Sequence, residues 1–110
     1  MKIEHKEKQF IFNGETWSFD KKIYEVRVVE GTILIIFDWM EWPKDKPAPN
    51  LEAYDLAKHK LWTAKNIGMG GADAWVGIHN EKPLQVHNFA GYLCDIDIKK
   101  GKVLKSQFTK

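Results

Sequence analysis

Apolar and polar side chains alternate along much of this chain, which is the pattern of β-strands that bury one face. Cys94 and Ile96, for example, alternate with Asp95 and Asp97. Residues 33–37 differ because they are apolar at every position, and such a run is typical of a strand that is buried on both faces. We therefore expect residues 33–37 to form a central strand with cover above and below it.

Turn residues divide the apolar runs into consecutive hairpins. Asn13-Gly14 is the strongest hairpin signal, because both residues readily adopt the positive φ angles of a two-residue turn, and Glu30-Gly31 marks a second turn. No credible helix remains between the turns. The pattern predicts an all-β fold of about ten short antiparallel strands, at residues 9–12, 15–19, 23–29, 32–39, 51–55, 60–64, 74–79, 84–89, 92–98 and 102–108.

Two parts of the sequence echo each other. Residues 51–62 align without a gap with residues 93–104, and each part contains an extended run, an Asp-led turn with lysines, and a second apolar run. The distance between the two parts is that of a four-stranded propeller-type unit of about 40–45 residues. We expect Asp55 and Asp97, which correspond in the alignment, to begin the two turns by accepting hydrogen bonds from backbone amides.

Chain length limits the architecture. The 110 residues are predicted to form a single all-β domain, residues 1–110, with residues 1–8 as a frayed N-terminus. A closed propeller of four such units would need about 160 residues, so the chain resembles at most about two and a half propeller blades. The alternatives are an open twisted sheet, a sandwich, or a homodimer that covers exposed strand edges.

The sequence predicts a cytoplasmic protein. The first residues are charged and lack the apolar core of a secretory signal, and no apolar run approaches the roughly 20 residues of a membrane helix. The single cysteine, Cys94, cannot form an internal disulfide, which agrees with a reducing compartment. Its neighbours in the alternation are apolar, so we expect Cys94 to be a small core side chain.

Two irregular stretches interrupt the strands. Residues 41–50 contain three prolines, which exclude a helix and a central strand, and residues 66–73 are rich in glycine. The glycine-rich stretch lacks the Lys-Ser/Thr ending of a phosphate-binding loop and no helix follows it, so it is expected to be a connector. Loops held by a rigid scaffold often carry binding sites.

No catalytic set, cofactor or metal site is predicted. If residues 80–83 form a turn, Leu84 stands opposite His79, which places His79 and His87 on opposite faces of their hairpin, where one ion cannot bind both. Asp95 and Asp97 share a face but have no cleft that would raise a pKa for acid-base chemistry.

The tryptophans divide into two groups. Trp17 and Trp62 lie in alternating strands and are predicted to be core residues. Trp39 and Trp42 lie beside acidic residues at the start of the proline-rich loop, where they form an interface or, as the alternative, one of them caps the sheet edge. The predicted partner-binding residues are Asp38, Trp39, Glu41, Trp42, Asp45, Asp73 and Trp75.

Two parts of the chain resemble motifs of small bacterial proteins built like fragments of a propeller. These parts are residues 50–55 with Lys60-Leu61-Trp62, and residues 91–97 with residues 100–104. The resemblance covers roughly residues 9–110 and is to proteins of the kind that serve as immunity proteins for contact-dependent or polymorphic toxins. It implies no cofactor and no catalytic residue. His59 stands where a turn glycine is usual, which implies that the Asp55 turn is looser than its counterpart.

These observations predict a non-enzymatic, cytoplasmic protein-binding module, with a toxin immunity protein as its specific form. The acidic residues beside Trp39 and Trp42 would cover a basic cleft, such as that of a nuclease. One alternative is a small-ligand-binding or enzymatic β domain with a pocket between its sheets. Another is a nucleic-acid binder that uses the lysine-rich C-terminus, which the net charge of only +2 disfavours.

Overall fold

The computed structural model describes residues 1–109, and it confirms the predicted all-β class. Within these residues the only helices are two three-residue 3₁₀ turns, and neither is long and apolar enough to cross a membrane. All strand pairs within the three sheets are antiparallel. The elements are β1 (Lys2–Ile3), β2 (His5–Lys6), β3 (Gln9–Phe12), β4 (Glu15–Ser18), β5 (Ile23–Val29), β6 (Thr32–Phe37), η1 (Trp39–Glu41), β7 (Leu51–Tyr54), β8 (Lys60–Thr63), η2 (Gly70–Ala72), β9 (Trp75–Glu81), β10 (Leu84–Asn88), β11 (Tyr92–Ile96) and β12 (Val103–Phe108).

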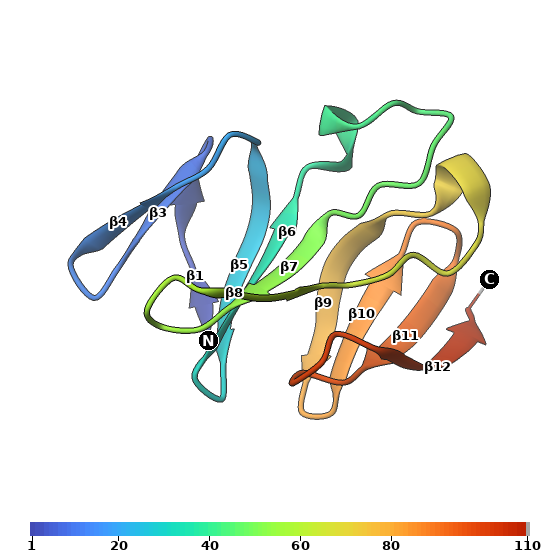
Figure 1. Ribbon diagram of the computed structural model, residues 1–110. Coiled ribbons are helices and arrows are strands. Elements are labelled where there is room, and N and C mark those ends of the chain that lie inside the picture. The colour runs from blue at the N-terminus through green and yellow to red at the C-terminus, as the bar shows by residue number, and fades with distance from the viewer. Residues whose placement is uncertain (110) are drawn as a thin grey trace.

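The strands form three open sheets that follow one another along the molecule (Figure 1). The middle sheet has the strand order β1-β5-β6-β7-β8. One hydrophobic cluster joins it to the three-stranded sheet β2-β3-β4, and a second cluster joins it to the four-stranded sheet β12-β11-β10-β9. None of these sheets closes into a barrel.

Strand β6 lies at the centre of this arrangement, as its uninterrupted apolar sequence predicts. Ile33, Leu34, Ile35 and Ile36 have no exposed surface. Because successive side chains of a strand point to opposite faces, Leu34 and Ile36 enter the cluster shared with the four-stranded sheet, whereas Ile33 and Ile35 enter the other. The prediction of a strand covered on both faces is therefore confirmed.

The five predicted hairpins are all present, with strand ends shifted by a few residues. Asn13-Gly14 and Glu30-Gly31 have positive φ angles at both positions, as the tight turns require. The N-terminal residues, expected to be frayed, instead form β1, paired with β5, and β2, paired with β3. These strands are only two residues long and largely exposed, so they have no hydrophobic pattern by which the sequence could have revealed them.

The two Asp-led turns are built as the repeat predicts. Asp55 accepts hydrogen bonds from the amides of Ala57 and His59, and Asp97 accepts one from the amide of Lys99. The turns differ by one residue, because Asp55 N bonds His59 O whereas Asp97 N bonds Lys102 O. The gapless alignment of the two parts therefore holds for β7 and β11 but loses register after the turn.

A buried ion pair connects the middle sheet to the four-stranded sheet. Glu25 on β5 is 6% exposed and accepts a hydrogen bond of 2.6 Å from Arg27. Its other oxygen accepts a bond of 3.1 Å from the amide of Ile78 on β9, whose carbonyl in turn accepts from Arg27 at 3.2 Å. These contacts hold β5 of the middle sheet against β9 of the four-stranded sheet.

Candidate functional site

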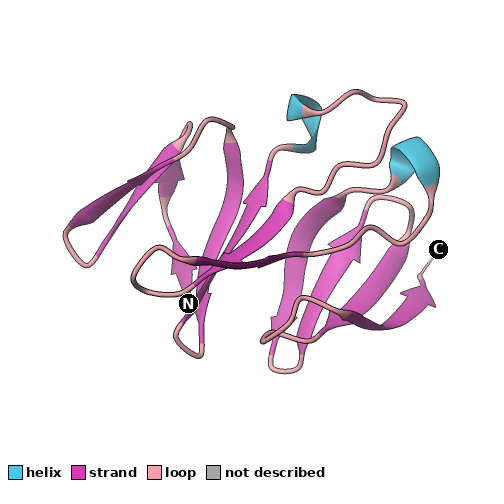
Figure 2. Ribbon diagram, in the orientation of Figure 1, coloured by secondary structure: helices cyan, strands magenta, loops and turns pink. Residues whose placement is uncertain are grey.

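The proline-rich loop and the glycine-rich loop lie together at one end of the molecule, where both short helices are found (Figure 2). Ala48 and Ala74 form an isolated parallel bridge, and Asn66 donates a hydrogen bond of 3.0 Å to Ala48 O. The backbones come so close that a Cβ atom on Gly71 would lie 2.5 Å from Lys44 O. The two loops therefore form one continuous surface.

Asp73 organises this loop pair from inside. Its side chain has no exposed surface, and its oxygens accept hydrogen bonds from the amides of Gly68 and Met69 and from the amides of Asn66 and Asn88. Burial works to raise the pKa of Asp73, but the hydrogen bonds outweigh it and hold the pKa below its usual value. The structure thus removes Asp73 from the predicted partner-binding set, because a buried carboxylate cannot contact a partner.

The structure also removes Trp75 from the predicted partner-binding residues. Trp75 has no exposed surface and belongs to the hydrophobic cluster between the middle and four-stranded sheets. Its backbone is also buried, where Asn50 Oδ1 accepts from Trp75 N at 2.8 Å and Asn50 Nδ2 donates to Trp75 O at 2.7 Å. The sequence predicted a strand at residues 74–79 but counted Trp75 among the exposed partner-binding residues, whereas β9 directs its indole into the core.

Trp39 and Trp42 lie on different sides of η1. Trp42 packs against the cluster that contains Ile23 and Phe37, and the Lys21 ammonium lies 5.2 Å from its ring centroid. Trp39 instead lies between Tyr24, with ring centroids 5.1 Å apart, and Phe89, at 6.2 Å. The sequence predicted one shared site for the two tryptophans, and the structure separates them.

We call the group Tyr24, Trp39, Met40 and Phe89 the Trp39 surface. Tyr24 is 47% exposed, Met40 67% and Phe89 57%. A groove of about 250 Å³ opens between Trp39, Phe89 and the proline-rich loop, and Lys44 and Lys46 are part of its lining. Sequence analysis did not identify Tyr24, which lies in β5, or Phe89, which lies in the turn after β10, because both are far from Trp39 in the chain.

The predicted acidic residues play a smaller part on this surface than expected. Asp38 Oδ1 caps η1 by accepting from Met40 N at 2.9 Å, and Glu41 Oε1 accepts from Lys22 N at 3.0 Å. Asp45 is exposed in the proline-rich loop. Since the charged side chains that line the groove are Lys44 and Lys46, the groove is basic, whereas the sequence predicted an acidic site.

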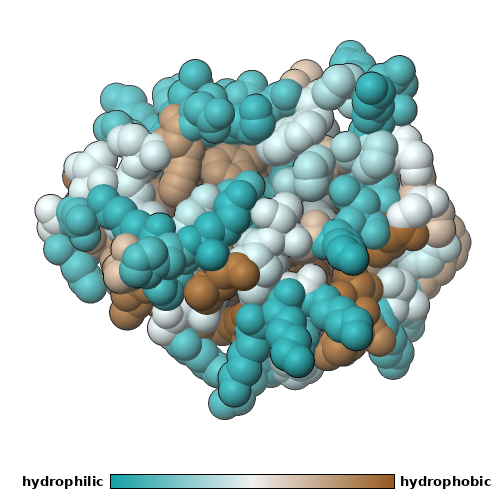
Figure 3. All heavy atoms as spheres, in the orientation of Figure 1, coloured by the Kyte–Doolittle hydropathy of each residue, from teal (hydrophilic) through white to brown (hydrophobic). Residues whose placement is uncertain are grey.

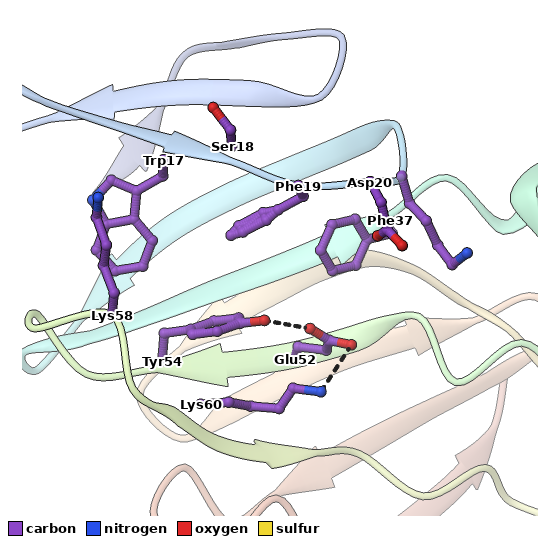
Figure 4. Close-up of a pocket in the computed structure, with 10 residues that line it drawn as sticks. Trp17, Ser18, Phe19, Asp20, Phe37, Glu52, Tyr54, Lys58 and Lys60 are labelled. Carbon is purple, nitrogen blue, oxygen red and sulfur yellow. Dashed lines mark hydrogen bonds and ion pairs between the residues drawn. The ribbon is translucent and has the colours of Figure 1, made fainter.

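A second hollow, which we call the Tyr54 cleft, lies between β4 and the edge of the middle sheet. It measures about 420 Å³, and its lining residues are Trp17, Ser18, Phe19, Asp20, Lys21, Phe37, Glu52, Tyr54, Lys58 and Lys60. Figure 4 shows Trp17, Phe19 and Phe37 facing Tyr54, Glu52 and Lys60 across it. In the space-filling view, light-brown atoms lie in a recess framed by hydrophilic ones at the upper left (Figure 3).

Charged groups meet aromatic rings in the Tyr54 cleft. Tyr54 donates a hydrogen bond of 2.7 Å to Glu52, whose other oxygen lies 3.6 Å from Lys60 Nζ (Figure 4). Burial of Tyr54, its hydrogen bond to Glu52 and the negative charges of Glu52 and Asp20 raise the pKa of Tyr54 above its usual value. The phenol therefore stays protonated and acts as a hydrogen-bond donor.

The histidine pair also differs from the prediction. The rings of His79 and His87 lie 5.0 Å apart, edge to face, so they share one side of the hairpin. The reason is a register shift between Gln85 and Val86, which moves His79 relative to its expected partner. Within residues 1–109, however, no group of three or more metal-ligating side chains is present.

We expect acid to destabilise the protein in part through Asp73. Because its folded-state pKa is depressed, its contribution is fully present above the unfolded pKa of about 3.9 and is lost as the pH falls through the lower folded value. Urea unfolding between pH 7 and pH 2.5 should show this loss in the wild type. Asp73→Asn should be less stable at pH 7 and show a smaller decrease below pH 4.

The exposed Asp45→Asn is the control, and its stability at pH 7 should change by less than about 0.5 kcal/mol. An Asp73→Asn variant with the stability and pH dependence of the wild type would contradict the organising role of this carboxylate.

Comparison with known proteins identifies a family but no named relative. No curated protein and no solved structure gives a significant match to this chain. The family model that matches spans nearly the whole chain and carries the description "Domain of unknown function". Residues 1–108 match this family, DUF7957, and the chain therefore belongs to it.

Proposed function

We propose that this protein is a non-enzymatic, cytoplasmic protein-binding module that recognises its partner through the Trp39 surface. The observation that carries the proposal is the meeting of Tyr24, Trp39 and Phe89, from three separate segments, with Met40 exposed beside them. Aromatic residues and methionine are enriched at protein interfaces, and tryptophan and tyrosine are frequent binding hot spots.

The geometry also supports a preformed site. Trp39 is held by the 3₁₀ turn that Asp38 caps, and the loops on either side of the groove are joined through Ala48, Asn66 and Asp73. A site whose backbone is fixed before binding loses less conformational entropy when a partner associates. This favours specific recognition over non-specific hydrophobic contact.

Charge indicates the chemistry of the partner. Lys44 and Lys46 line the groove, and complementary charge increases both the association rate and the specificity of binding. A partner that inserts an apolar side chain into the groove and presents carboxylates to the two lysines therefore fits best. Neutralisation of a toxin domain remains the specific form that we propose. Its support is the resemblance of the chain to small bacterial proteins built like fragments of a propeller, some of which serve as immunity proteins.

The test uses the tagged protein and a double variant, Trp39→Ala with Phe89→Ala, to capture partners from a lysate. The matched control is Leu104→Ala, which removes a 65% exposed apolar side chain from β12. A protein bound by the wild type and the control but not by the double variant is expected. With that partner purified, the double variant should bind at least about 30-fold more weakly, because hot-spot truncations commonly cost 2 kcal/mol or more.

A partner that binds the double variant as tightly as the wild type would overturn the assignment to the Trp39 surface. The toxin proposal has a separate test, in which the captured domain is expressed alone and with each variant. Growth arrest that the wild type relieves and the double variant does not is expected. If the captured partner has no effect on growth, the proposal of a protein-binding module stands and the proposal of an immunity role is wrong.

A further inference from the structure

We propose that the Tyr54 cleft is a second binding site, independent of the Trp39 surface, and that it binds an organic ammonium group. The cleft combines aromatic rings with the carboxylates Asp20 and Glu52 in about 420 Å³, a volume within the usual range of ligand pockets. The proposed protein interface does not include these residues.

Aromatic rings in several orientations line the cleft. Phe19 meets Phe37 at 69° and Tyr54 at 62°, and Trp17 meets Tyr54 at 90°, with ring centroids 5.4 to 6.0 Å apart. Trp17 and Phe37 are buried, whereas Phe19 and Tyr54 are half-buried in this lining. The negative face of an aromatic ring attracts an organic cation. The aromatic lining alone is compatible with an uncharged apolar ligand as well.

The carboxylates decide between these ligand classes. Figure 4 shows Asp20 beside Phe37 and Glu52 across from it. Within residues 1–109, Asp20 takes part in no salt bridge, and Glu52 has only the long 3.6 Å contact to Lys60, whose side chain is 49% exposed. An ammonium group between the two carboxylates would gain charge-assisted hydrogen bonds.

The lysines of the lining do not reverse this preference, because two of them have other partners. Lys58 Nζ bonds Glu15 and Thr16 O, both at 3.1 Å, and lies 5.6 Å from the Trp17 ring centroid. Lys21 Nζ lies over the ring of Trp42, which is not part of the lining. Asp20, which takes part in no salt bridge within residues 1–109, would attract a cation and repel an anion.

The ammonium group has two sources, a free small amine and a lysine side chain of a protein. The test begins with butylammonium as the probe and 1-butanol as its uncharged analogue, both titrated into the protein and followed by amide and indole NMR signals. Butylammonium is expected to shift signals of Trp17, Phe19 and Tyr54, at a concentration at least tenfold lower than 1-butanol. Spermidine and a capped Gly-Lys-Gly peptide then distinguish the two sources by their affinities.

Two variants test the carboxylates. Asp20→Asn and Glu52→Gln keep the size of the side chain and remove its charge, and each should weaken butylammonium binding at least fivefold. Glu30→Gln is the control, because Glu30 is exposed in the β5–β6 turn and pairs with Lys82. Circular dichroism of each variant confirms that it is folded before titration.

Equal binding of butylammonium and 1-butanol would show that the cleft recognises apolar groups without charge, which overturns the proposal. Unchanged affinity in both carboxylate variants, or the absence of any shift around Trp17, would also overturn it. The Trp39→Ala, Phe89→Ala variant should bind butylammonium like the wild type, so failure at one site is distinguishable from failure at the other.

Discussion

Gly101→Ala is expected to lower the free energy of unfolding by about 3–4 kcal/mol. Gly101 has a φ of +72°, and a Cβ atom added to it would overlap the indole ring of Trp62. Trp62 cannot move aside easily, because it is 8% exposed and its Nε1 donates to Ile98 O at 2.9 Å. Urea unfolding of the variant measures the loss directly.

Gly14→Ala separates the cost of a positive φ angle from the cost of the overlap with Trp62, which together destabilise the Gly101→Ala variant. Gly14 has a nearly identical φ of +74°, but an added Cβ atom would meet nothing within 4 Å. This control therefore carries only the cost of the left-handed backbone, about 1 kcal/mol. Equal losses in the two variants would contradict the predicted overlap between the added Cβ atom and the Trp62 ring.

Asn50→Ala is expected to lower the free energy of unfolding by about 4 kcal/mol. Asn50 has no exposed surface, and its side chain makes three hydrogen bonds of 2.7 to 2.8 Å, to Phe37 O, Trp75 O and Trp75 N. The truncation leaves these buried backbone groups without their side-chain partner, which costs more than the loss of an exposed hydrogen bond. Because the bonds join the ends of β6 and β9, the variant should also expose the loops to proteolysis.

Asn50→Asp tests the direction of these bonds. The aspartate can still accept from Trp75 N, but it cannot donate to the two carbonyls and places a charge beside them, so it should be at least as destabilising as alanine. Asn80→Ala is the control, since it removes one exposed hydrogen bond to Pro83 O and should cost less than about 1 kcal/mol. A stable Asn50→Asp variant would contradict the role of the amide as a donor.

The local pattern of the sequence predicted the strands well, because period-two alternation and turn residues act over short distances. The hairpins at Asn13-Gly14 and Glu30-Gly31 and the buried strand β6 all follow from neighbouring residues. The likeness to propeller blades and to immunity proteins stays a prediction. The short strands β1 and β2 were not predicted, since their pairing depends on edges supplied by β5 and β3.

The candidate surfaces show where sequence reasoning stops. The sequence drew attention to the loop that carries Trp39, and a binding role for this loop stays a prediction. It also joined Trp39 to Trp42 and included Asp73 and Trp75, which are buried. The histidine pair shows the same limit, because a single register shift between Gln85 and Val86 changes which face His79 occupies. Errors of this kind arise where a shift of one residue in the strand register reverses the direction of a side chain.

The all-β class, the five hairpins and the central position of β6 follow from the sequence alone, because side-chain period and turn chemistry are local properties. The packing of the three sheets, and with it the meeting of side chains from distant segments, is visible only in the folded chain. The Trp39 surface joins β5, η1 and the end of β10, and the Tyr54 cleft joins β4 to β7 and β8. Such meetings depend on long-range packing, for which the sequence contains no short-range signal.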